Sequence, residues 1–136
     1  MNIEKLTALL LEHEGEKLFP YRCTAGRWTL GVGRNISDKG ISKKESRFML
    51  QNDIQECYDD LQPLFVYFDL LPESIQHTLL DMRFQLGGAG FRKFRKMITA
   101  VNNHNQEEMI KQMIDSNWYK QVPNRAKHLI KMIREG

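Results

Sequence analysis

The chain has 136 residues, of which 41% are hydrophobic and 27% charged, a composition typical of one globular domain. Its formal net charge of +3 suits an anionic partner but does not distinguish a wall polymer from nucleic acid or a membrane surface. The N-terminus lacks the apolar run of a secretory signal, and no stretch approaches the roughly 18 apolar residues of a membrane-spanning helix. We expect a protein made in the cytoplasm that reaches any external target by another route.

The cysteines and histidines do not indicate a disulfide framework or a metal site. Cys23 and Cys57 are the only cysteines, they form no CxxC motif, and we expect both to be free thiols. The four histidines lack metal-ligand spacing; they are His13, His77, His104 and His128. We therefore expect neither a metal nor another cofactor.

The first expected elements are a helix and a hairpin. Asn2 can cap a helix that Gly15 ends, which leaves Glu14 on its last turn. The stretch 18–35 contains a proline and three glycines that exclude a helix. Its alternating apolar residues predict a small antiparallel hairpin that turns near 24–26.

Helical sequence follows a turn expected at 38–40. Ser42 and Glu45 form a capping box, which predicts a helix from Ser42 to Leu61. Pro72 opens the next helix, and the glycine pair at 87–88 closes it.

Three shorter helical segments are expected after these, at 91–101, 107–115 and 123–134. The architecture predicted for residues 1–136 is a single domain with a small hairpin lobe at about 15–41 and a connecting helix at about 42–61. The rest of the domain is a larger helical lobe at about 62–136, and the helix at 2–14 is expected to join this lobe. A cleft between two lobes is a natural place for an extended ligand.

A carboxylate and a hydroxyl in the first part of the chain could carry chemistry. Glu14 ends a helix, and Thr29 lies in the hairpin between aromatic and aliphatic neighbours. Glycosidic cleavage needs an acid that protonates the leaving oxygen and a group on the opposite face of the sugar that manages water or the cation. A carboxyl group in a partly apolar cleft can have a raised pKa and serve as that acid. By pattern alone, a Glu at a helix end is more often a solvated surface residue.

Three separated blocks resemble, in the right order, the signatures of the phage-type lysozymes, a glycoside hydrolase family. The first comprises a Glu-Gly pair at 14–15, Tyr21 and the sequence TLGVG at 29–33. The second is MRFQLG at 82–87, and the third is WYKQVPNRA at 118–126. The resemblance implies a lysozyme-like α+β fold that is mostly helical, with the two lobes around a cleft.

The resemblance also implies roles for particular residues. Glu14 would be the general acid, and Thr29 would position the water. Arg125 would approach Glu14, favour its charged form and orient it. The residues implied in substrate binding are Asn35, Phe84 and Gln85. Phe84 has an alternative interpretation as an ordinary core residue.

Cys23 stands where the family usually has its second carboxylate. A thiol has an unperturbed pKa of about 8.5, and the neighbouring Arg22 and Arg27 could lower it. Three roles remain open for Cys23: a thiolate base or nucleophile, a weak polar holder of water beside Thr29, or a buried bystander.

Arg34 is a second departure, because the family pattern commonly has His at this position. Arg34 could pair with Asp53 on the following helix and brace the hairpin against it. A surface arginine that contributes little to stability is the alternative.

Basic residues gather at 92–96 and along the helix expected at 123–134. The first cluster suits an anionic wall or lipid better than nucleic acid. The second forms a basic amphipathic pattern that could lie on a membrane, although its apolar face more often belongs to the core.

The function implied by the resemblance is that of an endolysin, a bacteriolytic muramidase that hydrolyses the β-1,4 bond between N-acetylmuramic acid and N-acetylglucosamine in peptidoglycan. Such a monomeric enzyme would need no cofactor and would wait in the host cytoplasm until a holin-type membrane protein opened a path. Two alternatives remain: a lytic transglycosylase acting on the same bond, and a non-catalytic wall-binding or membrane-disrupting protein on the same scaffold.

Overall fold

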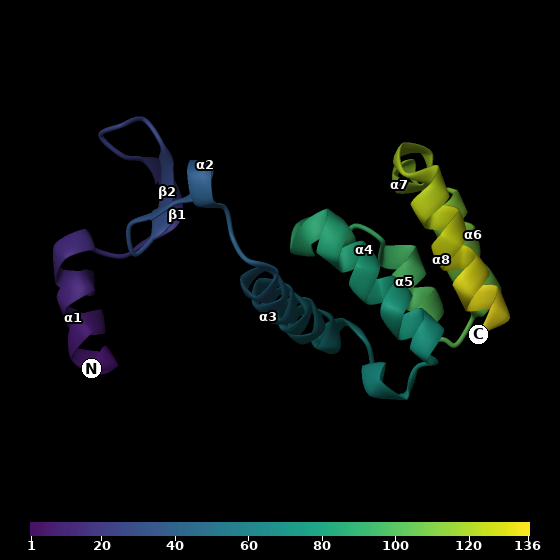
Figure 1. Cartoon of the computed structure of the whole chain (residues 1–136). Coiled ribbons are helices and arrows are strands. Elements are labelled where there is room, and N and C mark those ends of the chain that lie inside the picture. Colours follow the sequence, from purple (N-terminus) through teal and green to yellow (C-terminus); the bar gives the residue numbers. More distant parts are fainter. The chain divides into compact units, whose positions relative to one another are not determined.

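The computed structural model describes all residues 1–136 and divides them into two compact units, 1–48 and 49–136. Helices make up most of the chain, and one small antiparallel sheet is its only β structure (Figure 1). These elements confirm the mostly helical α+β class. None of the helices combines the length and the apolar composition that crossing a bilayer requires.

Unit 1 contains one helix, a three-stranded sheet, a short second helix and the start of the long third helix. The elements are α1 (Ile3–Glu14), β1 (Lys17–Arg22), β2 (Trp28–Gly31), β3 (Arg34–Asn35), α2 (Ile36–Lys39) and α3 (Lys43–Leu61). As expected, Asn2 caps α1, and its side-chain oxygen accepts a hydrogen bond of 2.9 Å from the amide of Lys5. Gly15 follows the helix with a φ of 71°, a value that favours glycine.

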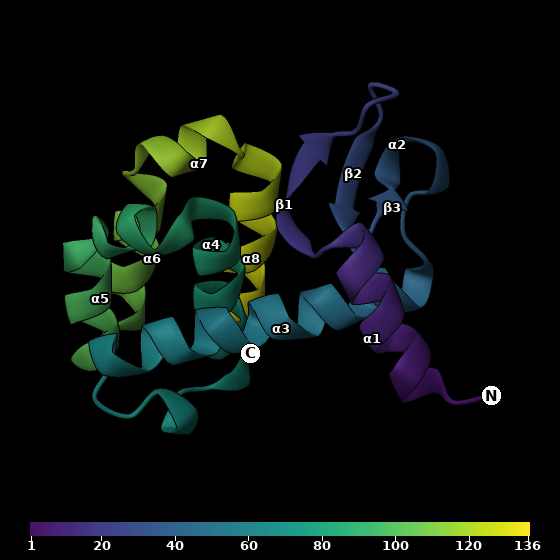
Figure 2. The same cartoon turned by 90° about the vertical axis from the view of Figure 1, so that its left-hand side faces the viewer.

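The sheet has the order β1-β2-β3, with both pairs of neighbours antiparallel. Figure 2 shows the three strands side by side, with α2 next to them. The expected hairpin is confirmed, and its turn is closed by a hydrogen bond of 2.8 Å from the amide of Gly26 to the carbonyl of Cys23. The pairing register is irregular between Lys17 and Tyr21, where the strand bulges.

The strand β3 and the helix α2 were not expected from the sequence, which indicated only a turn at 38–40. Asn35 explains the difference, since its side-chain oxygen accepts a hydrogen bond of 3.1 Å from the amide of Asp38 and so caps α2. The helix is one turn long and ends at Gly40. Too few residues take part for a helical period to show.

The capping box at the start of α3 is confirmed on both sides. The hydroxyl oxygen of Ser42 accepts a hydrogen bond of 3.1 Å from the amide of Glu45. The carboxylate of Glu45 accepts one of 2.8 Å from the amide of Ser42. The helix continues to Leu61, as expected, and carries the boundary between the two units.

Unit 2 contains the rest of α3, two turns of 3-10 helix and five further helices. The elements are η1 (Gln62–Leu64), η2 (Phe68–Leu70), α4 (Glu73–Arg92), α5 (Arg95–Asn102), α6 (Gln106–Ile114), α7 (Asn117–Gln121) and α8 (Pro123–Glu135). The helix expected after Pro72 is confirmed as α4. Gly87, with a φ of 76°, interrupts it at the expected end, but a further helical turn continues to Arg92. The next helix therefore starts at Arg95 rather than at Phe91.

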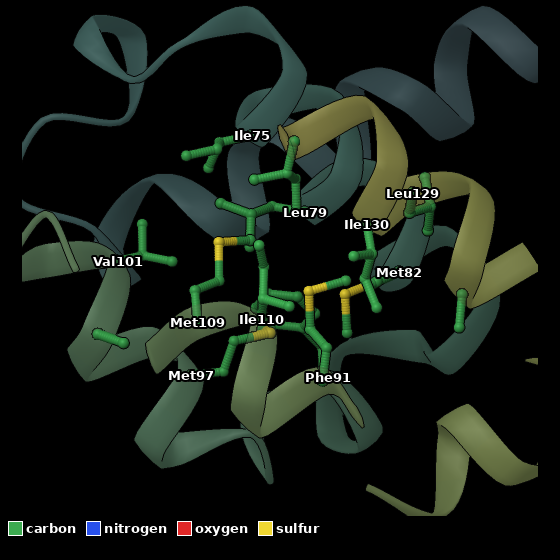
Figure 3. Close-up of a cluster of buried hydrophobic side chains, with 14 of the residues drawn as sticks. Ile75, Leu79, Met82, Phe91, Met97, Val101, Met109, Ile110, Leu129 and Ile130 are labelled. Carbon is green, nitrogen blue, oxygen red and sulfur yellow. The ribbon is translucent and has the colours of Figure 1, made fainter. Parts of the chain in front are cut away.

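The core of unit 2 is built from aliphatic, methionine and aromatic side chains of α3, α4, α5, α6 and α8 (Figure 3). Its fully buried members include Leu61, Leu79, Met82, Phe91, Met97, Met109, Ile110 and Ile133. Each buried side chain of this size contributes about 1.5–3 kcal/mol to stability relative to its exposed state. The polar residues of α4 and α8 lie on helices that are anchored in this core.

An ionic cluster ties α3 to α4 beside this core. Nε of Arg83 donates a hydrogen bond of 2.7 Å to the carboxylate of Asp60, which also pairs with Arg92. Only 14% of the Arg83 side chain is exposed, so the pair is well shielded from solvent. Removing Asp60 would leave the partly buried guanidinium of Arg83 with only a longer contact, of 3.8 Å, to the carboxylate of Glu56. The cluster fixes α4 where the second family-like sequence block lies.

The helix expected at 2–14 is α1, and it belongs to the compact unit that holds the sheet. All of its side chains are exposed within the structure. Its expected association with the helical lobe stays a prediction.

Candidate active site

Glu14 is the last residue of α1, and its carboxylate lies against the turn that joins β2 to β3. A Cβ atom at Gly33 would lie only 2.6 Å from Oε2 of Glu14 and 3.1 Å from its Cδ. Gly33 also has a φ of +62°, which side chains rarely adopt. The backbone conformation favours glycine at this position, and a larger residue would also have to displace the end of the Glu14 side chain. The sequence pattern contained Gly33 but did not reveal this contact.

Thr29 occupies the middle of the sheet and is only 5% exposed. It pairs with Tyr21 on β1 and with Asn35 on β3. Its hydroxyl donates a hydrogen bond of 3.1 Å to the carbonyl of Arg27. A hydroxyl that donates in this way keeps its lone pairs as acceptors for a water.

Cys23 is half-buried at the start of the hairpin turn. The backbone of Arg27 contacts both Cys23 and Thr29: its carbonyl accepts hydrogen bonds from the amide of Cys23, at 2.9 Å, and from the Thr29 hydroxyl. The backbone amides of Arg27 and Ala25 lower the pKa of the Cys23 thiol, and the Thr29 hydroxyl lowers it further, while desolvation opposes the shift. The hairpin therefore places the thiol beside the hydroxyl and lowers the pKa of the thiol.

The main causes of the lowered pKa are backbone hydrogen bonds and not the side chains of Arg22 and Arg27, which the sequence had suggested as candidates. The guanidinium of Arg22 lies over the ring of Trp28, 4.5 Å from its centroid, and donates a hydrogen bond to the carbonyl of Gly26. The guanidinium of Arg27 pairs with Asp38 at 3.4 Å. Both charges have other partners, so the oriented backbone amides of the turn stabilise the anion instead.

The side chain of Asn35 is engaged in the cap of α2. Its oxygen accepts from the amide of Asp38, and its nitrogen donates a hydrogen bond of 2.9 Å to the carboxylate of the same residue. These two hydrogen bonds give Asn35 a local structural role at the start of α2. Its implied role in substrate binding stays a prediction.

Arg34 pairs with Glu45 and not with Asp53, which was one of the two possibilities that the sequence left open. Two contacts of 2.6 Å join the guanidinium to the two carboxylate oxygens of Glu45. The capping box holds Glu45 at the start of α3, facing the incoming chain, whereas Asp53 lies two turns further along the helix. The hydrogen bond from Arg34 and those from Ser42 lower the pKa of Glu45 to about 2.

Phe84 lies on α4 and is 47% exposed within the structure, so it is not a residue of the unit 2 core. It lines a hollow of about 460 Å³ in unit 2. The other residues of the hollow are Leu50, Ile54, Cys57, His77, Leu80, Asp81 and Arg125. Phe84 and Arg125, from two separate sequence blocks, thus share one surface.

Gln85 connects the second and third family-like blocks. Its side-chain oxygen accepts a hydrogen bond of 2.8 Å from the indole nitrogen of Trp118. The indole is 3% exposed and packs edge-to-face against Phe94. Gln85 itself is exposed, and its amide nitrogen remains available to donate to a ligand.

Arg125 is held by Asp81, a residue that the sequence analysis did not single out. Nε of Arg125 donates a hydrogen bond of 2.7 Å to the carboxylate, and a second nitrogen lies 3.5 Å from the Asp81 carbonyl. The helical spacing that places Asp81 one turn before Gln85 could have indicated it. Arg125 and Glu14 belong to different compact units, and their implied approach stays a prediction.

Comparisons with known proteins show which proteins the chain resembles. A probable T4-type lysozyme 2 from Dictyostelium discoideum is 24% identical over 163 aligned positions, which cover 98% of this chain and 96% of the relative. The pre-baseplate central spike protein Gp5 of Enterobacteria phage T4 is 29% identical over 110 positions, 77% of this chain and 19% of that protein. An endolysin of Acyrthosiphon pisum secondary endosymbiont phage 1 is 40% identical over 57 positions, 39% of this chain and 38% of the endolysin.

The family model of the phage lysozymes matches residues 11–134. The match includes all three sequence blocks and every residue to which the resemblance assigned a role. The chain therefore belongs to the phage lysozyme family, and this membership supports the role of a lysozyme-type glycoside hydrolase.

Proposed function

We propose that the chain is an endolysin muramidase that hydrolyses the β-1,4 bond between N-acetylmuramic acid and N-acetylglucosamine in peptidoglycan and so lyses the host cell. The observation that carries the proposal is the arrangement in unit 1. The Glu14 carboxylate lies against Gly33, at the end of the turn that follows the strand of Thr29. A proton donor, Glu14 at the end of α1, and a water-binding hydroxyl, that of Thr29 in β2, would supply the two elements that glycosidic hydrolysis needs.

In the proposed reaction, Glu14 gives its proton to the leaving oxygen as the bond from that oxygen to the anomeric carbon breaks. A water that donates a hydrogen bond to Thr29 attacks the same carbon from the opposite face. Cys23, whose thiol pKa is lowered by the backbone amides of the turn, acts as a thiolate in this scheme and accepts one proton from the water. Solvent later returns a proton to Glu14 and removes one from Cys23, so the cycle balances.

This sequence of steps inverts the configuration at the anomeric carbon. A nucleophilic Cys23 would instead form a thioglycoside and give overall retention after its hydrolysis. Proton NMR of the first product formed distinguishes the two, because the newly formed reducing end is α after inversion and β after retention.

The proposal assigns the binding of the glycan to Phe84 and Gln85. Phe84 offers an exposed aromatic ring. Gln85 offers the nitrogen of its side-chain amide, because the oxygen of the same amide accepts a hydrogen bond from Trp118. Arg125 supports the site through its charge, with Asp81 holding its guanidinium. Asn35 is proposed as a further residue that contacts the glycan.

Mass spectrometry of the fragments released from purified peptidoglycan tests the proposal. We expect fragments with reducing muramic acid ends from the wild type and none from Glu14→Gln, since general acid catalysis typically contributes 10² to 10⁴ in rate. Retention of more than about a tenth of the activity in Glu14→Gln would contradict the role of Glu14.

A lytic transglycosylase is the second candidate, favoured by one observation: a thiol, Cys23, stands where the family usually has a carboxylate. Transglycosylation needs only one catalytic acid because a hydroxyl group of the sugar attacks. Anhydromuramic ends in the same experiment would identify it. A non-catalytic protein that disrupts walls or membranes would kill cells as effectively with Glu14→Gln as without it.

The proposal includes a path to the substrate. The enzyme acts as a monomer and stays in the host cytoplasm until a holin-type membrane protein opens the inner membrane. Expression in bacteria without a holin should leave cells intact until the membrane is permeabilised with chloroform. Lysis before that treatment would contradict this part of the proposal.

A further inference from the structure

An ion pair between Arg34 and Glu45 joins the sheet of unit 1 to the start of α3. Both guanidinium nitrogens lie 2.6 Å from carboxylate oxygens, the paired geometry that gives such contacts their specificity. One of those oxygens, Oε1, also accepts the hydrogen bond from the amide of Ser42. A single carboxylate thus joins β3 to the first turn of α3.

Arg34 stands between two residues that touch the candidate catalytic groups. Gly33, directly before it, contacts the Glu14 carboxylate. Asn35, directly after it, pairs with Thr29 across the sheet. The backbone of Arg34 itself pairs with Leu30. A shift of Arg34 along the strand would therefore move the surface on which Glu14 rests and the partner of Thr29 together.

We propose that Arg34 and Glu45 are positioning residues, which hold the turn before β3 so that Glu14 and Thr29 keep their catalytic geometry. The inference rests on the proposed hydrolase function. Neither residue touches the reacting atoms in this scheme. Their effect is on the placement of Glu14, and small errors of placement cost large factors in rate.

Matched amide variants test the role. Glu45→Gln keeps a side chain that can serve in the capping box and removes the charge, and Arg34→Gln removes the other partner. Arg47→Gln is the control, because Arg47 lies exposed on the same helix and takes part in none of the ion pairs. All variants are compared well below their unfolding temperatures, with folding checked by circular dichroism.

We expect Arg34→Gln and Glu45→Gln each to lower kcat by roughly tenfold and to change KM little, while Arg47→Gln matches the wild type. The double variant should be no slower than the slower single variant, since the two residues act as one unit. Arg34→Lys, which keeps the charge, should recover part of the loss. A normal kcat in folded Arg34→Gln would overturn the positioning role.

A second readout does not depend on activity. The ¹³C chemical shift of the Glu14 carboxyl group should change in Arg34→Gln and stay unchanged in Arg47→Gln. An unaltered shift in Arg34→Gln would also overturn the inference. A wild-type protein that releases no wall fragments would contradict the proposed function instead, so the two failures are distinguishable.

Discussion

The indole of Trp118 donates a hydrogen bond of 2.8 Å to the side-chain oxygen of Gln85, across 33 positions of the chain. The bond connects α7 to α4 and joins two of the sequence blocks that identify the family. It engages the side-chain oxygen of Gln85 and leaves the side-chain nitrogen free to donate. The orientation of the Gln85 amide is thereby defined before any substrate arrives.

Replacing this donor should loosen the amide. Trp118→Phe keeps an aromatic ring for the edge-to-face contact with Phe94 but removes the N–H group. We expect a loss of about 0.5–1.5 kcal/mol from the hydrogen bond, together with part of the packing of the larger ring, and a raised KM for the glycan. Thermal unfolding and steady-state kinetics measure the two effects. An unchanged KM would show that Gln85 does not bind substrate through the fixed amide.

Local rules of capping and turn formation were sufficient to predict several elements from the sequence. The cap by Asn2, the box of Ser42 and Glu45, and the stop near Gly87 each depend on residues within one turn of each other, and each is found. The helix α7 was missed because five residues are too few for a helical period, although Ser116 caps it.

Contacts between elements were less predictable. The partner of Arg34 depends on the path of the chain through α2, and that short helix was not expected. The lowered pKa of Cys23 depends on backbone amides, which every residue carries and no sequence motif marks. The contact of Glu14 with Gly33 requires the turn and the helix end to meet in space, which the resemblance implied only as a shared site.

Two glycine substitutions should separate backbone strain from a steric effect on Glu14. Gly33→Ala and Gly26→Ala both place a side chain at positive φ, at 62° and 75°, and each should cost about 1–2 kcal/mol. A Cβ at Gly26 meets nothing within 4 Å, whereas one at Gly33 meets the Glu14 carboxylate. We therefore expect only Gly33→Ala to lose turnover. Equal turnover in the two folded variants would show that Glu14 can move without cost.

The ion pair between Glu45 and Arg34 should stabilise the fold only at pH values where the Glu45 carboxylate is charged. Its folded pKa of about 2 lies below the ordinary value of 4.5, so the contribution is complete above pH 4.5 and is lost as the pH falls toward 2. The difference in unfolding temperature between wild type and Glu45→Gln should shrink over that range. A difference that stays constant down to pH 2 would mean that the charge of Glu45 is not responsible.

Thr29 should affect both turnover and the neighbouring thiol. Thr29→Val removes the hydroxyl that donates to the Arg27 carbonyl, and we expect a cost of about 0.5–1.5 kcal/mol with a strong fall in kcat. Because the hydroxyl also lowers the pKa of Cys23, that pKa should rise in the variant. Thr29→Ser, which keeps the hydroxyl, is the control. Unchanged turnover in Thr29→Val would mean that another group holds the water.

The thiol of Cys23 should be selectively reactive. Cys23 is half-buried with a lowered pKa, while Cys57 is 3% exposed and burial raises its pKa. Iodoacetamide should therefore inactivate the enzyme by modifying Cys23, as peptide mapping would show. The rate of inactivation against pH reports the thiol pKa. A pKa at or above the ordinary value would leave Cys23 only the role of a neutral holder of water.

Two substitutions then decide what Cys23 contributes. Cys23→Asp supplies the carboxylate usual in the family and should keep substantial activity, because either an anion or a polar acceptor can serve the attacking water. Cys23→Ala should lose much of it, since Thr29 alone then contacts the water. Normal turnover in Cys23→Ala, with at most a modest loss of stability, would make Cys23 a bystander. Glu14 and Thr29 would then be the whole catalytic set, and the transglycosylase alternative, which requires only one catalytic acid, would become the stronger one.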